Sequence, residues 1–264
     1  MTFRVINSKI DTCSVVRVIN SKNVKKVKKM FVDIHNHSLF GVDDGPEQKE
    51  ETIAMLTEAR KQGAEAIILT PHYRHGMFAY PLEKIQSNFQ ALKESVEELG
   101  LKIHLGCEYH VNSNIVEALQ TGRCRTLAES DYVLTEYSYL TEYSYITEHT
   151  GRLISCGFFP VIAHVERYKC FQKKPALCAE LSNMGALIQI NADSVLGMAG
   201  FTEKQFCKKL LKNGWADIIA SDAHNCTDRA CNMAQCQAYV EKKYGSEYAT
   251  QLFLENPRKV MNNR

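Results

Sequence analysis

The sequence of 264 residues lacks the features of a secreted protein built on disulfides. It has ten cysteines but no Cys-x-x-C pair, and a chain of this length can bury a full apolar core without disulfides. We therefore expect the cysteines to be buried free thiols in the reducing environment of the cytoplasm.

Long apolar runs are also missing. Residues 15–19 are apolar but too few, and Arg17 interrupts them, so the basic N-terminus is not followed by the apolar stretch of a signal peptide. No other run approaches the roughly 20 residues that span a bilayer. The sequence thus predicts a cytoplasmic protein without a transmembrane segment.

An excess of positive charge is absent from most of the chain. Residues 1–29 carry eight Lys and Arg against one Asp, which leaves 24 basic and 29 acidic residues in the remainder, a net charge of −5. Such a balance gives no overall basic surface of the kind that binds nucleic acid. Nucleic acid is therefore not an expected partner.

The first 29 residues are predicted to be separate from the rest. Arg4-Val-Ile-Asn-Ser-Lys9 recurs as Arg17-Val-Ile-Asn-Ser-Lys22, and four lysines follow within residues 24–29. A short, basic, duplicated segment has too little apolar surface to form a core. We interpret residues 1–29 as a disordered or non-native extension, with docking to anionic lipid or a partner as the alternative. Residues 30–264 are interpreted as one domain.

From residue 31 onward, short apolar runs alternate with amphipathic segments. Helices are predicted between the strands, for example over residues 52–62 and 202–213, and both of these end at a glycine. Seven such alternations imply a parallel sheet, either a barrel or a doubly wound sheet. The predicted strands cover residues 31–35, 66–70, 102–106, 132–135, 160–163, 187–190 and 217–220.

Potential metal ligands follow six of the seven predicted strands, and the remaining strand ends at Asn191. In parallel β/α architectures the functional site lies at the carboxyl ends of the strands. Ligands from so many strands converge on one centre only if the strands surround it, so the pattern favours a barrel of seven strands. The residues are His35, His37, His72, Glu108, Glu136, His164, Asp222 and His224.

Each of these residues alone has a simpler interpretation. A histidine after a strand, such as His72, is more often a loop residue that forms a hydrogen bond, and Glu108 alone would more often be a surface acid. His35-Asn-His37 and Asp222-Ala-His224 are stronger signals because alternate residues of an extended segment point the same way and can hold one ion. Imidazole and carboxylate ligands without thiolate suit Mn, Fe or Zn.

Six motifs, in this order, resemble the polymerase and histidinol phosphatase (PHP) superfamily. They are Asp33-Ile-His-Asn-His37, Asp43-Asp-Gly-Pro46, Thr70-Pro-His72, Gly106-Cys-Glu108, Ile162-Ala-His-Val-Glu-Arg167 and Ser221-Asp-Ala-His-Asn225. Within the superfamily, residues 30–264 resemble the bacterial tyrosine-protein phosphatases of capsule and exopolysaccharide operons, the CpsB/YwqE type. The resemblance implies a distorted (β/α)7 barrel of the PHP type.

The resemblance also implies a site for three metal ions, usually manganese, with Fe, Zn, Mg or Co as alternatives. Glu108 would bridge two of the ions. One ion would be held by His35, His37, Glu108 and Asp222, a second by Glu108, Glu136 and His164, and the third by Asp44, His72 and His224.

Two of these assignments have a competing residue nearby. The family pattern selects Asp44 over its neighbour Asp43, which we interpret as a turn or supporting residue. Thr135-Glu-Tyr-Ser-Tyr139 is repeated as Thr141-Glu-Tyr-Ser-Tyr145. Glu136 is preferred to Glu142 because only Glu136 directly follows a predicted strand.

Two arginines are the candidates for binding the phosphate. Arg167 and Arg229 closely follow proposed ligands and could bind phosphate in a bidentate manner, with surface salt bridges as the alternative. Arg74 and His75 are weaker candidates. No cysteine is followed six residues later by arginine, so the loop of thiolate phosphatases is absent. The expected nucleophile is a hydroxide held at the metal site, which attacks phosphorus in line.

The substrate expectation depends on the resemblance alone. It implies phosphotyrosine in the C-terminal tyrosine cluster of a partner kinase that controls polysaccharide synthesis, with peripheral membrane association only through that partner. A phosphatase of small molecules such as histidinol phosphate is the enzymatic alternative. The alternative of another class is a regulator that binds phosphotyrosine without catalysis.

Overall fold

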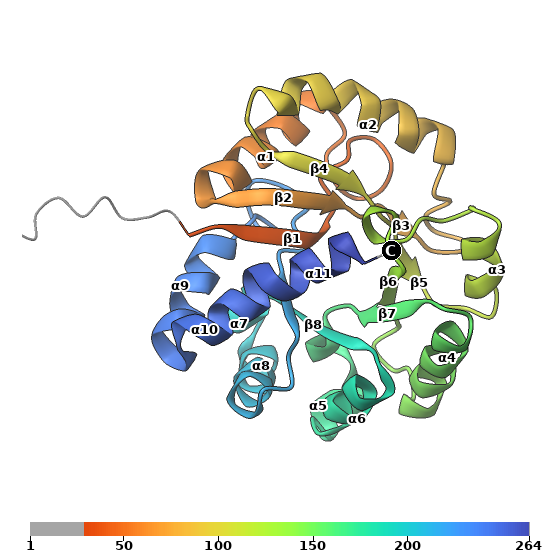
Figure 1. Ribbon diagram of the computed structural model, residues 1–264, viewed down its shortest axis with the longest axis vertical. Helices are drawn as coiled ribbons and strands as arrows, with labels where there is room; N and C mark the ends of the chain where they lie inside the picture. Colours follow the sequence, from red (N-terminus) through yellow and green to blue (C-terminus); the bar gives the residue numbers. More distant parts are fainter. Residues whose placement is uncertain (1–28, 264) are drawn as a thin grey trace, which may run out of the picture.

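The computed structural model of the protein describes residues 29–263. In that part of the chain, nine short strands pair in parallel and form two sheets around a common interior (Figure 1). One sheet has the order β1 (Phe31–Asn36), β2 (Ala64–Leu69), β4 (Lys102–Leu105). The other has the order β3 (His72–Tyr73), β5 (Glu108–His110), β6 (Tyr132–Glu136), β7 (Phe159–Ile162), β8 (Leu187–Asn191), β9 (Ile218–Ala220).

All seven predicted strands are present, and two of them continue into a second short strand. The second predicted strand becomes β2 and β3, and the third becomes β4 and β5. Backbone hydrogen bonds connect the segments across these breaks, from Gly106 N to Leu69 O (2.8 Å) and from Glu108 N to Pro71 O (3.2 Å). A Cβ at Gly106 would lie 2.9 Å from Leu127 Cδ2, so glycine permits the close approach at the break.

The predicted β/α barrel type is confirmed, but its strands do not form one continuous ladder. The β1 and β9 ends are joined by backbone hydrogen bonds from Asp222 N to His35 O and from His37 N to Ala223 O, both 2.9 Å. Between β4 and β6 the chain inserts the short helix η2 (Leu127–Glu129), which packs against both strands. The ring is therefore distorted, as the resemblance implies.

Helices cover the outside of the ring (Figure 1). They bury the apolar faces expected from their sequences, as in α2, where Ile85, Phe89, Leu92 and Val96 point into the core. The remaining outer helices are α1 (Lys49–Gln62), α3 (Ile115–Gln120), α4 (Tyr143–Ser155), α5 (Lys169–Lys173), α6 (Leu177–Met184), α7 (Ala192–Leu196), α8 (Phe201–Asn213), α9 (Met233–Tyr244) and α10 (Ser246–Thr250), with α2 spanning Leu82–Glu97.

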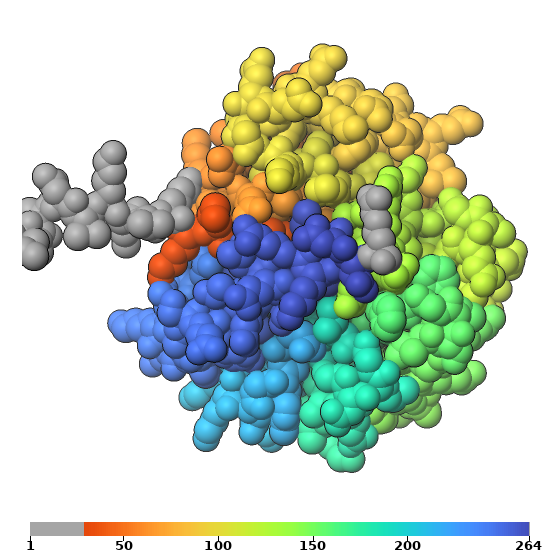
Figure 2. Space-filling view, in the orientation of Figure 1, coloured from red at the N-terminus to blue at the C-terminus, as the bar shows by residue number. Residues whose placement is uncertain are grey.

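The C-terminal segment covers the amino-terminal end of the ring. It consists of η4 (Gln251–Glu255) and α11 (Asn256–Asn262), which cross the centre of the face seen in Figures 1 and 2. Val260 packs into the apolar interior, which is lined by strand residues such as Val32 and Ile68. This end is thereby filled with apolar side chains, and the polar residues lie at the carboxyl ends of the strands.

Three further sequence predictions concern the N-terminal extension, the cysteines and the absence of a membrane span. Residues 1–28 lie outside the described residues, so the predicted extension stays a prediction, although Lys29 forms an ion pair with Glu241. Most described cysteines are buried, but Cys156 and Cys226 are exposed. No helix in the described part of the chain is long and apolar enough to cross a membrane.

Candidate metal centre

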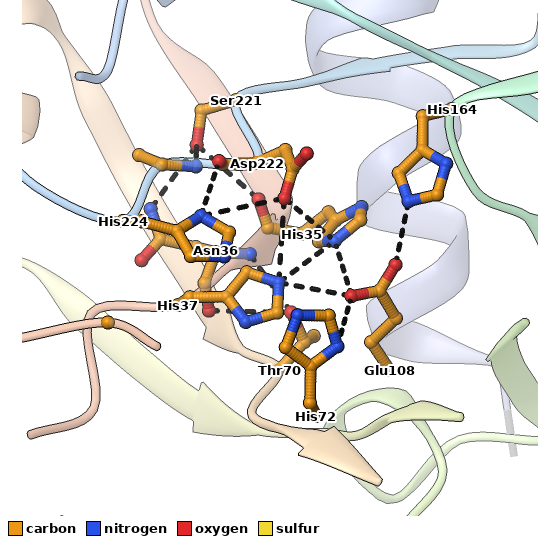
Figure 3. A network of polar contacts seen from close by, with 12 residues as sticks. His35, Asn36, His37, Thr70, His72, Glu108, His164, Ser221, Asp222 and His224 are labelled. Carbon is orange, nitrogen blue, oxygen red and sulfur yellow. Dashed lines mark hydrogen bonds and ion pairs between the residues drawn. The ribbon is translucent and has the colours of Figure 1, made fainter. Parts of the chain in front are cut away.

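Glu108 lies at the centre of a buried cluster of imidazoles (Figure 3). Its Oε2 atom is 3.3 Å from His35 Nε2, 3.2 Å from His37 Nε2 and 3.0 Å from His72 Nδ1. Its Oε1 atom is 2.9 Å from His164 Nε2. One carboxylate thus faces four imidazoles that come from three strand ends, those of β1, β3 and β7.

Two further carboxylates extend the cluster on either side. Asp222 Oδ1 lies 3.3 Å from His35 Nε2. Asp44 Oδ1 lies 3.4 Å from His72 Nε2 and 3.3 Å from His224 Nε2. Four groups of donor atoms within 4.8 Å of one another result: His37, Asp44, His72, His224; His35, His164, Asp222; His35, His37, Glu108; and His72, Glu108, Glu136.

The protonation of three imidazoles follows from their outer partners. His35 Nδ1 lies 3.0 Å from Gln189 Oε1, and His37 Nδ1 lies 2.9 Å from Asp43 Oδ2. His224 Nδ1 lies 2.8 Å from the main-chain oxygen of residue 222. All three partners are acceptors, so each Nδ1 carries a proton, and it is Nε2 that presents a lone pair to the cluster when the ring is neutral.

These lone pairs make the cluster suitable for cations. His35 Nε2 and His37 Nε2 are only 3.1 Å apart, and with both protons on Nδ1 neither atom can donate to the other. Donor atoms that share an ion at about 2.1 Å are separated by roughly 3 Å, the spacing found here. Buried atoms without a hydrogen-bond partner include Glu108 Oε2, Glu136 Oε2 and His224 Nε2. The donor set therefore fits metal ions.

The electrostatics of the carboxylates agree with this arrangement. Burial alone would raise the pKa of Asp222, but the charges of His35 and Arg167 hold it well below its usual range. Burial raises the pKa of Glu136 to about 7, and the charge of Glu108 adds to the effect. Burial and the charge of Arg167 lower the pKa of His164 to about 4. Several carboxylates and imidazoles, with His164 as a neutral ring, thus share one buried volume.

The structure shows different contacts for the two competing aspartates, Asp43 and Asp44. Asp43 Oδ2 accepts hydrogen bonds from His37 Nδ1 and from His72 N (3.1 Å), so Asp43 supports two of the proposed ligands from outside. Asp44 instead faces the imidazoles directly. A Cβ at Gly45 would lie 2.0 Å from His37 O, so only glycine lets this loop come so close to the end of β1.

The structure also separates the two competing glutamates. Glu136 is the last residue of β6, and its Oε1 atom lies 3.9 Å from His164 Nε2. Glu142 directly precedes α4, is exposed and takes no part in the cluster. The geometry therefore favours Glu136 as the ligand candidate.

Two arginines cover the cluster from the solvent side. Arg167 Nη2 lies 2.7 Å from Asp222 Oδ2, and Arg229 Nη1 lies 3.1 Å from Asp44 Oδ2. Both guanidinium groups line a cavity of about 220 Å³ above the cluster, and Arg74 lines it too. His75 is exposed and does not line this cavity. The side chains of Arg167 and Arg229 are about 40% exposed, which leaves them accessible to an anion.

Three features of the site lie outside the sequence predictions. His164 and Asp222 have positive φ angles of 31° and 53°, so two proposed ligands sit in strained backbone conformations. Gln189, the partner of His35, was not among the predicted residues. An amide in the middle of an otherwise apolar predicted strand was the only available signal for it.

Comparison with known proteins identifies the family. The family model described as capsular polysaccharide synthesis, CpsB/CapC, matches residues 31–262. The tyrosine-protein phosphatase CpsB of Streptococcus pneumoniae is 38% identical over 240 residues, which cover 88% of this chain and 98% of that protein.

Comparison with solved structures supports the same family. A crystal structure from work on YwqE of Bacillus subtilis and CpsB of S. pneumoniae, described as unique metal-dependent tyrosine phosphatases, aligns with a TM-score of 0.79 and 30% identity. The alignment covers 88% of this chain and 95% of the chain in that crystal structure. A histidinol phosphate phosphatase from Lactococcus lactis shares the fold alone, with a TM-score of 0.54, 18% identity and coverage of 81% and 94%. The family expected from the sequence motifs is confirmed, and the chain belongs to the CpsB/CapC family of capsular polysaccharide synthesis.

Proposed function

We propose that this protein is a metal-dependent protein-tyrosine phosphatase. The observation that carries the proposal is the convergence of nine imidazole and carboxylate side chains, with lone pairs facing inward, beneath two arginines. The relative CpsB from S. pneumoniae, which this chain matches over nearly its full length, is named a tyrosine-protein phosphatase. An anion bound by the arginines would lie directly above the cluster.

The proposed cofactor is manganese, with three ions. The overlapping groups of donor atoms support more than one ion, because Glu108 and His72 each belong to two groups. Carboxylates bridge ions readily, and oxygen with imidazole donors suits manganese. The proposed ligands are His35, His37, Asp44, His72, Glu108, Glu136, His164, Asp222 and His224.

The proposed roles of the protein groups follow from their positions. Metal ions bound here supply Lewis-acid activation of water and neutralise charge on the phosphoryl group. Arg167 and Arg229 bind the equatorial phosphate oxygens and orient the phosphorus for in-line displacement. Because burial raises the pKa of Cys107 well above its usual range, this thiol beside the cluster remains protonated and is not a nucleophile.

An adjoining cavity offers room for the rest of the substrate. It measures about 390 Å³ and shares Arg74 and Arg167 with the cavity above the cluster. Tyr137, Tyr139 and Tyr168 contribute to its lining. We assign this space to the tyrosyl ring of the substrate, since aromatic rings pack favourably against one another.

The proposed physiological substrate is the phosphorylated tyrosine cluster of a bacterial kinase that regulates capsule synthesis. The family description places related proteins in capsular polysaccharide synthesis. The proposed site of action is the cytoplasm, with peripheral membrane association only through the partner kinase.

A comparison of substrates tests the proposal. The manganese-loaded protein is expected to hydrolyse a phosphotyrosine peptide with a much higher kcat/KM than histidinol phosphate, and chelation of the metal should stop the reaction. Hydrolysis of histidinol phosphate alone would contradict the tyrosine assignment. Tight peptide binding without release of phosphate, at full metal occupancy, would instead identify a non-catalytic regulator.

The ligand cluster is tested separately by substitution. His35→Ala and Asp222→Ala each remove a buried donor at the centre of the cluster, so both variants should lose manganese and turnover. Metal content measured by elemental analysis reports on binding, and phosphate release reports on catalysis. Turnover equal to that of the parent in either variant would rule out the cluster as the active centre.

A further inference from the structure

The strand β8 corresponds to the only one of the seven predicted strands whose carboxyl end carries no proposed ligand. It carries two amides instead, Gln189 and Asn191, which are 0% and 2% exposed. Alternate residues of a strand point to the same side. Burying an amide is unfavourable unless its hydrogen bonds are made, so the two amides need partners in the interior.

The hydrogen bonds of Gln189 fix its orientation. His164 N donates to Gln189 Oε1 at 3.0 Å, and because a main-chain N–H can only donate, the atom that faces it must be the oxygen. The same oxygen lies 3.0 Å from His35 Nδ1, which must then donate as well. Gln189 Nε2 turns the other way and donates to Asn191 Oδ1 at 2.8 Å.

Asn191 extends this chain of bonds to a third proposed ligand. Its Nδ2 donates to Asp222 Oδ2 at 2.8 Å. The other oxygen of that carboxylate, Oδ1, is left facing His35 Nε2. The backbone N of Asn191 donates to the buried Glu166 (2.9 Å), which holds the strand end in place.

We propose that Gln189 and Asn191 are positioning residues of the metal centre. Gln189 sets the tautomer of His35, with its lone pair on Nε2, and restrains the positive-φ backbone of His164. Asn191 sets the orientation of the Asp222 carboxylate. One strand thereby arranges donor atoms on β1, after β7 and after β9. The inference depends on the proposed function only in that the cluster binds metal ions.

The test compares Gln189→Met with Gln189→Glu in the full-length protein. Methionine has a similar length but no strong acceptor, whereas glutamate keeps an oxygen for both His35 and His164. Outer partners of metal-binding histidines typically contribute about 10- to 100-fold to metal affinity. We expect Gln189→Met to weaken manganese binding by that factor in calorimetric titrations, and Gln189→Glu to recover most of it.

Two further measurements separate positioning from a general structural role. Nitrogen NMR of the histidine rings in the metal-free protein, at a pH high enough for the His35 ring to be neutral, should show the His35 proton on Nδ1 in the parent and partly on Nε2 in Gln189→Met. Gln237→Met is the matched control, since Gln237 is a buried glutamine on α9 whose amide donates to Met30 O, away from the cluster. It should leave both the tautomer and the manganese affinity unchanged.

The outcomes distinguish the inference from the proposed function. If the parent binds manganese and Gln189→Met binds it equally well with an unchanged tautomer, the inference is wrong and the proposed function stands. If the parent binds no metal, the proposed function itself is wrong. Should Gln189→Met fail to fold, Asn191→Leu carries the test, because it leaves Asp222 Oδ2 with Arg167 as its remaining donor and should lower manganese affinity. Parent-like affinity in Asn191→Leu would then overturn the inference.

Discussion

At the scale of single residues, the site is defined by which atom of each side chain already forms a hydrogen bond to a residue outside the cluster. Asp43 occupies the outer nitrogen of His37, and Gln189 occupies that of His35. Asp222 uses Oδ2 for Asn191 and Arg167, so Oδ1 remains for the cluster. Outer partners of this kind determine both the orientation and the proton position of a ligand.

The arginines have a proposed role distinct from metal binding, because they face the cavity above the ligands and could bind the phosphate. Arg167→Ala should lower kcat for a phosphotyrosine peptide on the order of 100-fold, since one preorganised donor to the developing charge is lost. Arg167→Lys should recover only part of this, because lysine lacks the planar pair of donors. Steady-state kinetics at saturating manganese is the measurement, and the manganese content of each variant shows that the site is loaded.

Arg123 provides the control for these arginine variants. Its guanidinium group pairs with Glu117 at 2.7 Å on the surface of α3, and both side chains are about half exposed. Exposed pairs contribute little to stability, so Arg123→Lys should behave as the parent. Equal kcat for Arg167→Ala and Arg123→Lys would show that Arg167 does not bind the phosphate.

At the scale of elements, the sequence predicted the strands well because parallel β/α units repeat a simple pattern. Each apolar run is followed by a polar residue where the chain leaves the interior, so the ligand candidates could be located by their position after a strand. His164 and Asp222 were found in this way, but their positive φ angles were not, because backbone strain depends on tertiary contacts.

The other features that the sequence did not predict also depend on tertiary contacts. The breaks between β2 and β3 and between β4 and β5 depend on contacts across the ring, and single-strand patterns carry no information about them. Gln189 is an exception in an apolar run, and its role becomes visible only when the fold brings His35 of β1 and His164, which follows β7, within hydrogen-bonding distance of it. Residues 253–262 show an apolar pattern, but their place across the end of the ring depends on tertiary packing.

The packing of helix α11 leads to a prediction at this scale. Val260 is fully buried in the apolar interior, so Val260→Ala removes two methyl groups and leaves a cavity there. We expect a loss of about 1–3 kcal/mol in the free energy of unfolding, measured by urea denaturation. Activity per folded molecule should be unchanged, because α11 lies at the end of the ring opposite to the metal centre.

A surface methionine is the control for this variant. Met184, at the end of α6, is 41% exposed, so Met184→Ala should change the free energy of unfolding by no more than about 0.5 kcal/mol. If Val260→Ala were as stable as Met184→Ala, α11 would not be an integral part of the interior.

At the scale of the whole molecule, the metal centre connects parts of the ring that the backbone joins only weakly. The β1 and β9 ends meet through two backbone hydrogen bonds, and the proposed ligands His35 and Asp222 lie on either side of that junction. Ions bound here would link both sheets through side chains. A ligand that binds only the folded state raises stability by mass action, by about 2.7 kcal/mol at 100 times its Kd.

The dependence of this stabilisation on pH follows from the protons that the metal-free cluster holds. Burial alone would lower the pKa of His35 and His37, but nearby carboxylates, Glu108 for both and Asp43 for His37, raise it. The pKa of Glu136 is raised to about 7, chiefly by burial. Groups with a raised pKa in the folded state stabilise it at low pH, and that contribution is lost as pH rises above their unfolded values.

A metal ion that binds here, manganese in our proposal, would have to displace these protons, so its binding would strengthen over the pH range in which the metal-free protein becomes less stable. We therefore expect the Tm of the chelated protein to fall between pH 6.5 and 8, from just above the ordinary imidazole pKa of about 6.5. The rise in Tm on adding manganese should be larger at pH 8 than at pH 6. Differential scanning calorimetry at both pH values measures it, with Asp222→Ala as the control that should show almost no rise. A gain in Tm that is equal at the two pH values, or smaller at pH 8, would mean that metal binding displaces no protons from this cluster.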